Sequence, residues 1–77
     1  MNKVRRKAIK EIIDQLGTLK EQLESITEDE QKAYDNLPES IQYSKRGHAM
    51  NYALCDMGDA TCSIEDAMST LQNMIER

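Results

Sequence analysis

The feature that most constrains this chain is a regular apolar repeat in its carboxyl-terminal half, between residues 47 and 75. Apolar side chains and one threonine recur there at alternating steps of four and three residues: Met50, Leu54, Met57, Thr61, Ile64, Met68, Leu71 and Ile75. This heptad spacing is typical of a long helix that packs lengthwise against another helix. We call such a line of contact residues a seam, and we predict a helix over about residues 45–76.

The amino-terminal half carries a second heptad repeat with no proline inside it, which predicts a first helix over about residues 3–34. Only Glu30 interrupts the predicted seam, whose members are Ile9, Ile12, Leu16, Leu19, Leu23, Ile26 and Ala33. Thr27 and Glu30 also form a capping-box pattern that could begin a new helix. The apolar register continues across them, which favours one continuous helix.

Residues 35–44 contain the connection, because Pro38 cannot lie inside a helix and disfavours the helical conformation just before it. Asn36 can cap a short helical turn, and Ser44 can cap the second long helix. Two helices of matched length with a short connection fold back on each other. We therefore predict an all-α, antiparallel two-helix hairpin that forms one domain over residues 1–77.

Two glycines weaken the predicted second helix. Gly47 lies so close to its start that we expect the first turn to fray. Gly58 could end one helix before another begins near Ser63. The seam keeps its phase across Gly58, which favours a continuous helix.

A second stripe runs beside the seam of the second helix, with members seven residues apart: Ala53, Ala60, Ala67 and Met74. Ile13 similarly widens the apolar face of the first helix. Such a face is too wide for one partner helix to cover. We therefore predict that two hairpins associate into a four-helix bundle, most simply a two-fold homodimer. The alternative is that these alanines serve helix propensity alone.

Composition narrows the class of protein. Seventy-seven residues without Trp or Phe must build their core from Leu, Ile, Met and Ala, which suits helix packing. No apolar run approaches the roughly 20 residues of a membrane span. The charged first residues do not resemble a secretory signal, so we expect a cytoplasmic protein without membrane contact.

Candidate catalytic and metal-binding side chains are poorly placed for chemistry. His48, Cys55 and Cys62 follow one another at steps of seven, or roughly 10.5 Å along a helix, which is too far for one metal ion or for a disulfide between the cysteines. The many carboxylates have no predicted cleft that would displace their pKa values. We therefore expect no enzymatic activity, no cofactor and no small-molecule substrate.

Charge is unevenly distributed. Residues 1–10 carry five cations and no acid, whereas the remainder carries 14 acids against five cations. We call the cationic segment the basic head; its members are Lys3, Arg5, Arg6, Lys7 and Lys10. One interpretation pairs these cations with Glu65, Asp66 and Glu76 at the same end of the hairpin. The other makes them contacts for nucleic acid or an acidic protein.

The connection and its surroundings gather residue types that are common at interfaces. The candidate partner-binding residues there are Tyr34, Leu37, Ile41, Tyr43 and Arg46, and Tyr52 on the outer face of the second helix extends them. Alternatively, the same side chains plug the open end of the bundle.

The segment Asp35-Asn36-Leu37-Pro38-Glu39-Ser40-Ile41-Gln42, followed by Ser44, Arg46-Gly47 and Met50, resembles the turn of small helical-hairpin proteins from phages and mobile elements of Gram-positive bacteria. The basic start and heptad-rich helices extend the likeness over most of the chain. The resemblance implies no catalytic residue, and His48, Cys55 and Cys62 lie outside its pattern.

These observations predict a non-enzymatic module that binds a protein partner. If the resemblance holds, the partner is part of a host defence system such as a CRISPR–Cas effector, whose basic channel an acidic face could occupy. Glu28, Asp29 and Glu30 are the candidate acidic contacts. The alternative function is a nucleic-acid-binding accessory or regulatory protein that uses the basic head, and a structural role in a phage particle stays open.

Overall fold

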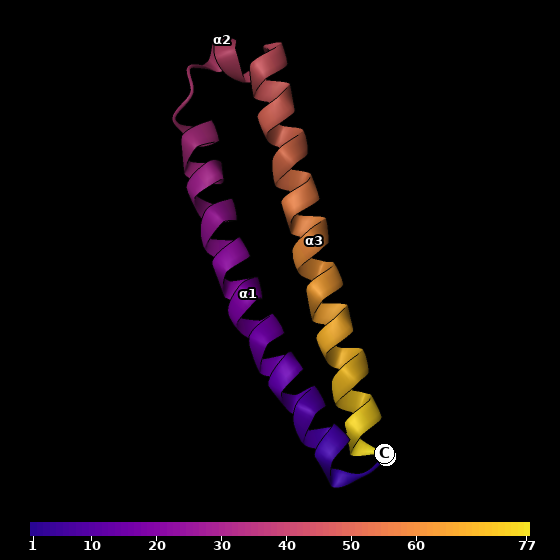
Figure 1. The fold of residues 1–77 in the computed structure, drawn as a ribbon. Coiled ribbons are helices and arrows are strands. Elements are labelled where there is room, and N and C mark those ends of the chain that lie inside the picture. The colour runs from indigo at the N-terminus through magenta and orange to yellow at the C-terminus, as the bar shows by residue number, and fades with distance from the viewer.

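The computed structural model describes residues 1–77 and is a hairpin of two long helices (Figure 1). Helix α1 spans Lys3–Asp35, the short helix α2 spans Glu39–Gln42, and helix α3 spans Lys45–Glu76. Helices α1 and α3 lie side by side in a rod of 58 × 15 × 12 Å, with the first and last residues at the same end (Figure 1). The predicted all-helical fold and the packing of two long helices are confirmed.

Two asparagines mark the ends of α1. The side chain of Asn2 accepts a hydrogen bond from the backbone N–H of Arg5 at 2.9 Å, which satisfies one of the free donors of the first turn. Asn36 has a helical backbone, with φ −85° and ψ −5°, and its N–H bonds to carbonyls of the last turn. An N-cap needs an extended backbone, so Asn36 closes α1 and the prediction that it caps α2 is wrong. Pro38 precedes α2 without a side-chain cap.

The start of α3 is capped by Ser44 and packs tightly against α2. Ser44 caps it as predicted, because its Oγ accepts from the backbone N–H of Gly47 at 3.4 Å. Gly47 is buried, and a Cβ there would collide with the carbonyl oxygens of Ile41 and Gln42. The absence of a side chain at Gly47 therefore lets the backbone of α2 lie directly against α3, where the sequence had predicted a frayed turn.

Both long helices are continuous through their weak points. The hydroxyl of Thr27 donates to the carbonyl oxygen of Leu23 at 2.8 Å, so it bonds within α1 and does not cap a new helix. Helix α3 passes through Gly58 without interruption. The competing local signals at Thr27 and Gly58 were thus overridden by the heptad register.

The seam of α3 contains the residues predicted from the sequence. Every one of its eight positions is buried or half-buried, while the remaining positions of the helix are mostly exposed. Leu54 and Ile75 are the only buried apolar side chains in the protein, at 9% and 5% exposure. The hairpin therefore has a thin core that consists mainly of half-covered side chains.

The predicted seam of α1 is wrong in about half of its members. Ile9, Leu16 and Leu23 do face α3, but Ile12, Leu19, Ile26 and Ala33 are exposed. The contact line is completed by residues of mixed character: Arg6, Ile13, Lys20, Thr27, Glu30 and Tyr34. The apolar face of α1 is wider than one helix can cover, so α3 contacts one edge of it and leaves the other edge open.

Candidate interaction surfaces

The hairpin has two different sides, which two contacts define. The Nζ atom of Lys20 lies 3.2 Å from a carboxylate oxygen of Glu65, and a Cβ built at Gly17 would lie 3.4 Å from the methyl of Met68. In the heptad abcdefg, Lys20 and Met68 occupy position a, whereas Gly17 and Glu65 occupy position e. In an antiparallel pair the e positions of both helices therefore line one side and the g positions the other.

We call the side of the e positions the polar flank. Its members are Lys10, Gly17, Glu24 and Gln31 on α1 and Asn51, Gly58, Glu65 and Gln72 on α3. At its centre Lys20 forms ion pairs with Glu24 at 3.1 Å and with Glu65 at 3.2 Å. The hydrogen bond to Glu24, and to a smaller extent the one to Glu65, raises the pKa of Lys20 above its ordinary value of 10.5.

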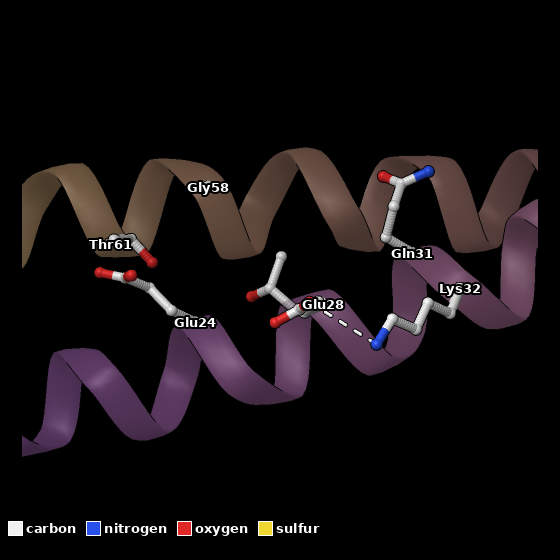
Figure 2. A pocket seen from close by; sticks show the side chains of 7 residues that line it. Glu24, Glu28, Gln31, Lys32, Gly58 and Thr61 are labelled. Carbon is white, nitrogen blue, oxygen red and sulfur yellow. Dashed lines mark ion pairs between the residues drawn. The ribbon is translucent and has the colours of Figure 1, made fainter.

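A shallow open groove of about 570 Å³ lies on the polar flank (Figure 2). It opens beside Gly58, where a side chain would meet no atom within 4 Å. Glu28 and Lys32 form an ion pair at 3.6 Å along its α1 edge. All lining side chains are polar or absent: Glu24, Thr27, Glu28, Gln31, Lys32, Gly58 and Thr61. No hydrophobic residue lines the groove, and its exposed apolar surface comes from the carbon atoms of these polar side chains and of the backbone.

We call the opposite side, that of the g positions, the apolar flank. Its members are Ile12, Leu19, Ile26 and Ala33 on α1 and Ala53, Ala60, Ala67 and Met74 on α3. Ile12, Leu19 and Ile26 leave 47%, 54% and 56% of their surface exposed. These large aliphatic side chains recur every seven residues along α1, and three alanines and Met74 recur at the same spacing along α3. Of the α3 members, Ala60 and Ala67 are exposed, whereas Ala53 and Met74 are half-buried.

The sequence identified only half of the apolar flank. The stripe from Ala53 to Met74 was predicted for self-association, but the α1 members were assigned to the hairpin seam. Ile13 was also predicted for self-association, but it is half-buried in the contact line with α3. The missed signal is that Ile13, Lys20, Thr27 and Tyr34 also recur every seven residues. This stripe, which mixes polar and apolar residues, makes the contact with α3 in place of the purely apolar stripe.

The basic head has two parts. The guanidinium of Arg6 donates to the carbonyl oxygen of Ile75 at 2.8 Å and to that of Met1 at 3.2 Å, so Arg6 ties the start of α1 to the end of α3. Lys3, Arg5, Lys7 and Lys10 are exposed, and none lies within 4.0 Å of a carboxylate oxygen. The interpretation that pairs the head with Glu65, Asp66 and Glu76 is therefore not seen, and Glu65 pairs with Lys20.

The candidate partner-binding residues at the turn also fall into two groups, one half-buried and one exposed. Tyr34, Leu37 and Ile41 are half-buried at the connection, where the Tyr34 carbonyl oxygen accepts a hydrogen bond from the side-chain amide of Gln42 at 3.1 Å. Tyr43 is 72% exposed and Arg46 is also exposed. Tyr52, at 71%, faces outward from α3.

The remaining candidates are dispersed. Cys55 and Cys62 are free and exposed, His48 is exposed, and no group of three or more His, Cys, Asp or Glu side chains is placed to hold a metal ion. Glu28 and Asp29 point to solvent, whereas Glu30 is half-buried in the contact with α3.

Comparisons with protein-family models, curated proteins and solved structures gave no match. Neither long helix has an apolar stretch of the length that a membrane crossing requires. The fold itself defines a rod-shaped helical hairpin with one polar and one apolar side.

Proposed function

We propose that this protein is a non-enzymatic protein-interaction module of the cytoplasm and that its binding surface is the apolar flank. The observation that carries this proposal is the exposed line of Ile12, Leu19 and Ile26. Soluble proteins keep contiguous exposed apolar patches small, and larger ones commonly mark sites of interaction with other proteins.

The geometry of the flank also indicates the kind of partner. Its large side chains repeat every seven residues, or roughly 10.5 Å, along a straight helix. Helices that pack lengthwise present their contacts at this spacing, as in helix-in-groove recognition. The flank therefore suits a helical partner that lies along the rod. The predicted four-helix bundle is one way to supply such helices.

A comparison of captured proteins tests this proposal. Tagged wild-type protein is incubated with lysate of the host, beside a variant with Ile12, Leu19 and Ile26 changed to serine. A matched control changes Glu24, Gln31 and Gln72 on the polar flank to serine. We expect specific partners, or a differently tagged copy of the chain itself, to be lost only with the first variant. Equal capture by both variants would contradict the proposal.

As part of this proposal, the partner outside the chain belongs to a host defence system such as a CRISPR–Cas effector. Its support is the acidic body, which complements the basic surfaces of nucleic-acid-binding proteins. Glu28 and Asp29 are exposed and suit a test by change to lysine, whereas Glu30 contacts α3 and would confuse stability with binding. Unchanged inhibition of such a system by the variant would remove the acidic face from the proposal.

A second candidate function, nucleic-acid binding through the basic head, is favoured by one observation: Lys3, Arg5, Lys7 and Lys10 form no ion pair within the chain. Binding through these cations should weaken steeply with added salt, because it releases counterions. Changing Arg5 and Lys7 to glutamine should reduce a mobility shift at low salt, while changing Lys45 at the far end should not. Arg6 is left intact because it bonds to the end of α3.

A further inference from the structure

We propose that the apolar flank is covered by a second copy of this chain, which runs antiparallel to the first with its turn at the opposite end. This inference rests on the proposed function, since it names the partner of the same surface. Four observations carry it: the direction of the apolar face of α1, the exposed area, the register of the hairpin and the distribution of charge.

The apolar face of α1 is not centred on α3. Its large aliphatic residues lie mainly at heptad positions d and g: Ile9, Leu16 and Leu23 at d, and Ile12, Leu19 and Ile26 at g. Position a, by contrast, includes Arg6, Lys20 and Thr27. At 3.5 residues per turn, the centre of the d and g positions lies about 50° away from the centre of the a and d positions. The apolar face of α1 therefore points between α3 and an absent neighbour, as helices do in a four-helix bundle.

The hairpin alone also exposes more surface than its mass predicts. Its accessible area is 5864 Å², whereas a compact monomer of this size exposes about 4,800 Å². The excess, about 1,100 Å², is larger than the roughly 800 Å² that each partner buries in an interface of standard size. A second hairpin laid along the apolar flank would remove area of this order.

The hairpin register allows a two-fold axis in the middle of the flank. The Lys20–Glu65 and Gly17–Met68 contacts place Leu19 and Ala67 at the same height along the rod. An axis at this height sets Leu19 against Leu19 of the partner subunit, and Ile12 against Ile26 of the partner subunit. On α3 it sets Ala67 against Ala67 of the partner subunit. One symmetry axis thus brings both stripes into register.

Charge selects the antiparallel orientation. The same axis places residues 3–10 beside residues 28–35 of the partner subunit. The first segment carries five cations, and the second carries Glu28, Asp29, Glu30 and Asp35 against Lys32 alone. With both turns at one end, the two basic heads would lie together. Complementary charges favour one orientation over the other even where they add little affinity.

The first test is the mass of the purified protein over a wide range of concentration, measured by sedimentation equilibrium. We expect a dimer for the wild type and a halved mass for Leu19→Glu, which places a charge on the axis. Ser25→Glu adds the same charge to the exposed outer face of α1 and should leave the dimer intact. A monomeric wild type, or a dimeric Leu19→Glu variant, would overturn the inference.

A cross-link tests the orientation without depending on a disruptive variant. Leu19→Cys is made with Cys55 and Cys62 changed to serine, and the folded protein is oxidised. The antiparallel dimer brings the two new thiols together on the axis, so a covalent dimer should form; Ser25→Cys in the same background should give none. A dimer that does not cross-link at residue 19 would contradict this orientation.

A charge exchange gives an independent readout of the register. Arg5→Glu and Asp29→Lys should each weaken the dimer, and the double variant should regain affinity because opposite charges again face each other. Failure of the double variant to recover would count against the antiparallel register. If the wild type is monomeric but the flank variants still lose a different protein, the second copy is excluded and the proposed function stands. If no variant of the flank changes any binding, both fail.

Discussion

Helices α1 and α3 are nearly equal in length, yet they meet each other in different ways. Helix α3 contributes all the buried residues, Gly47, Leu54 and Ile75, and its apolar stripe is its contact line. Helix α1 has no buried residue, and its contact line includes Arg6, Lys20, Thr27 and Glu30. Helix α3 thus covers its large aliphatic side chains within the hairpin, whereas α1 leaves Ile12, Leu19 and Ile26 exposed.

This difference separates two properties that a heptad pattern usually joins. The apolar stripe of a helix shows which face gains by leaving water, and the partner's position shows which face is covered. On α3 the two coincide for the large aliphatic side chains. On α1 they diverge, and the divergence marks the surface on which another molecule can bind.

The largest expected difference between the helices comes from truncating one leucine on each. Leu54→Ala should lower the free energy of unfolding of the hairpin by about 3 kcal/mol, because Leu54 is buried and its removal leaves a cavity. Leu19→Ala should lower it by about 1 kcal/mol or less when the protein is dilute enough to be monomeric. Urea unfolding followed by circular dichroism measures both. Similar values for the two variants would erase the distinction drawn between the helices.

A second contrast lies within α3, between its two glycines. Gly47→Ala should destabilise by about 2 kcal/mol, because the new Cβ would collide with the backbone of α2 and force the turn apart. Thermal unfolding measures the loss. An unchanged midpoint would show that α2 can move away freely, and that the turn end is not fixed by this close approach.

The same substitution at Gly58 should act in the opposite direction. Gly58→Ala should stabilise the protein by about 1 kcal/mol, since alanine is the better helix former and the site is open. The same thermal scans compare it with Gly47→Ala. Destabilisation at Gly58 would indicate that a partner, or a second copy, approaches α3 closely on the polar flank.

The smallest effect concerns Lys20, a charged member of the contact line of α1. The pKa of Lys20 is raised in the folded protein, so its ion pairs stabilise fully below its ordinary value of 10.5 and lose their effect as pH rises through the folded value. The stability difference between wild type and Lys20→Gln should therefore be constant around neutral pH and shrink above about pH 10.5. Urea midpoints at several pH values measure it, and a difference that persists in strong alkali would exclude Lys20 as its source.

The sequence predicts the architecture well because both helices repeat apolar residues with one period and one proline separates them. It predicts the seam of α3 for the same reason. It does not predict which edge of the α1 face meets α3, because Ile12 and Ile13 offer equally apolar starting points and only the packing of the whole hairpin decides between them. The role of Gly47 was also hidden, since close approach of α2 depends on the path of the turn.

Both termini lie at the same end of the 58 Å rod, so a single hairpin has two chemically different ends (Figure 1). One end displays the basic head, and the other displays Tyr43 beside the turn. Antiparallel pairing would abolish this polarity, because each end of the dimer would then carry one head and one turn. Such a dimer would hold two identical binding ends at a fixed separation, and it would gain avidity for a target that presents two matching sites at that spacing.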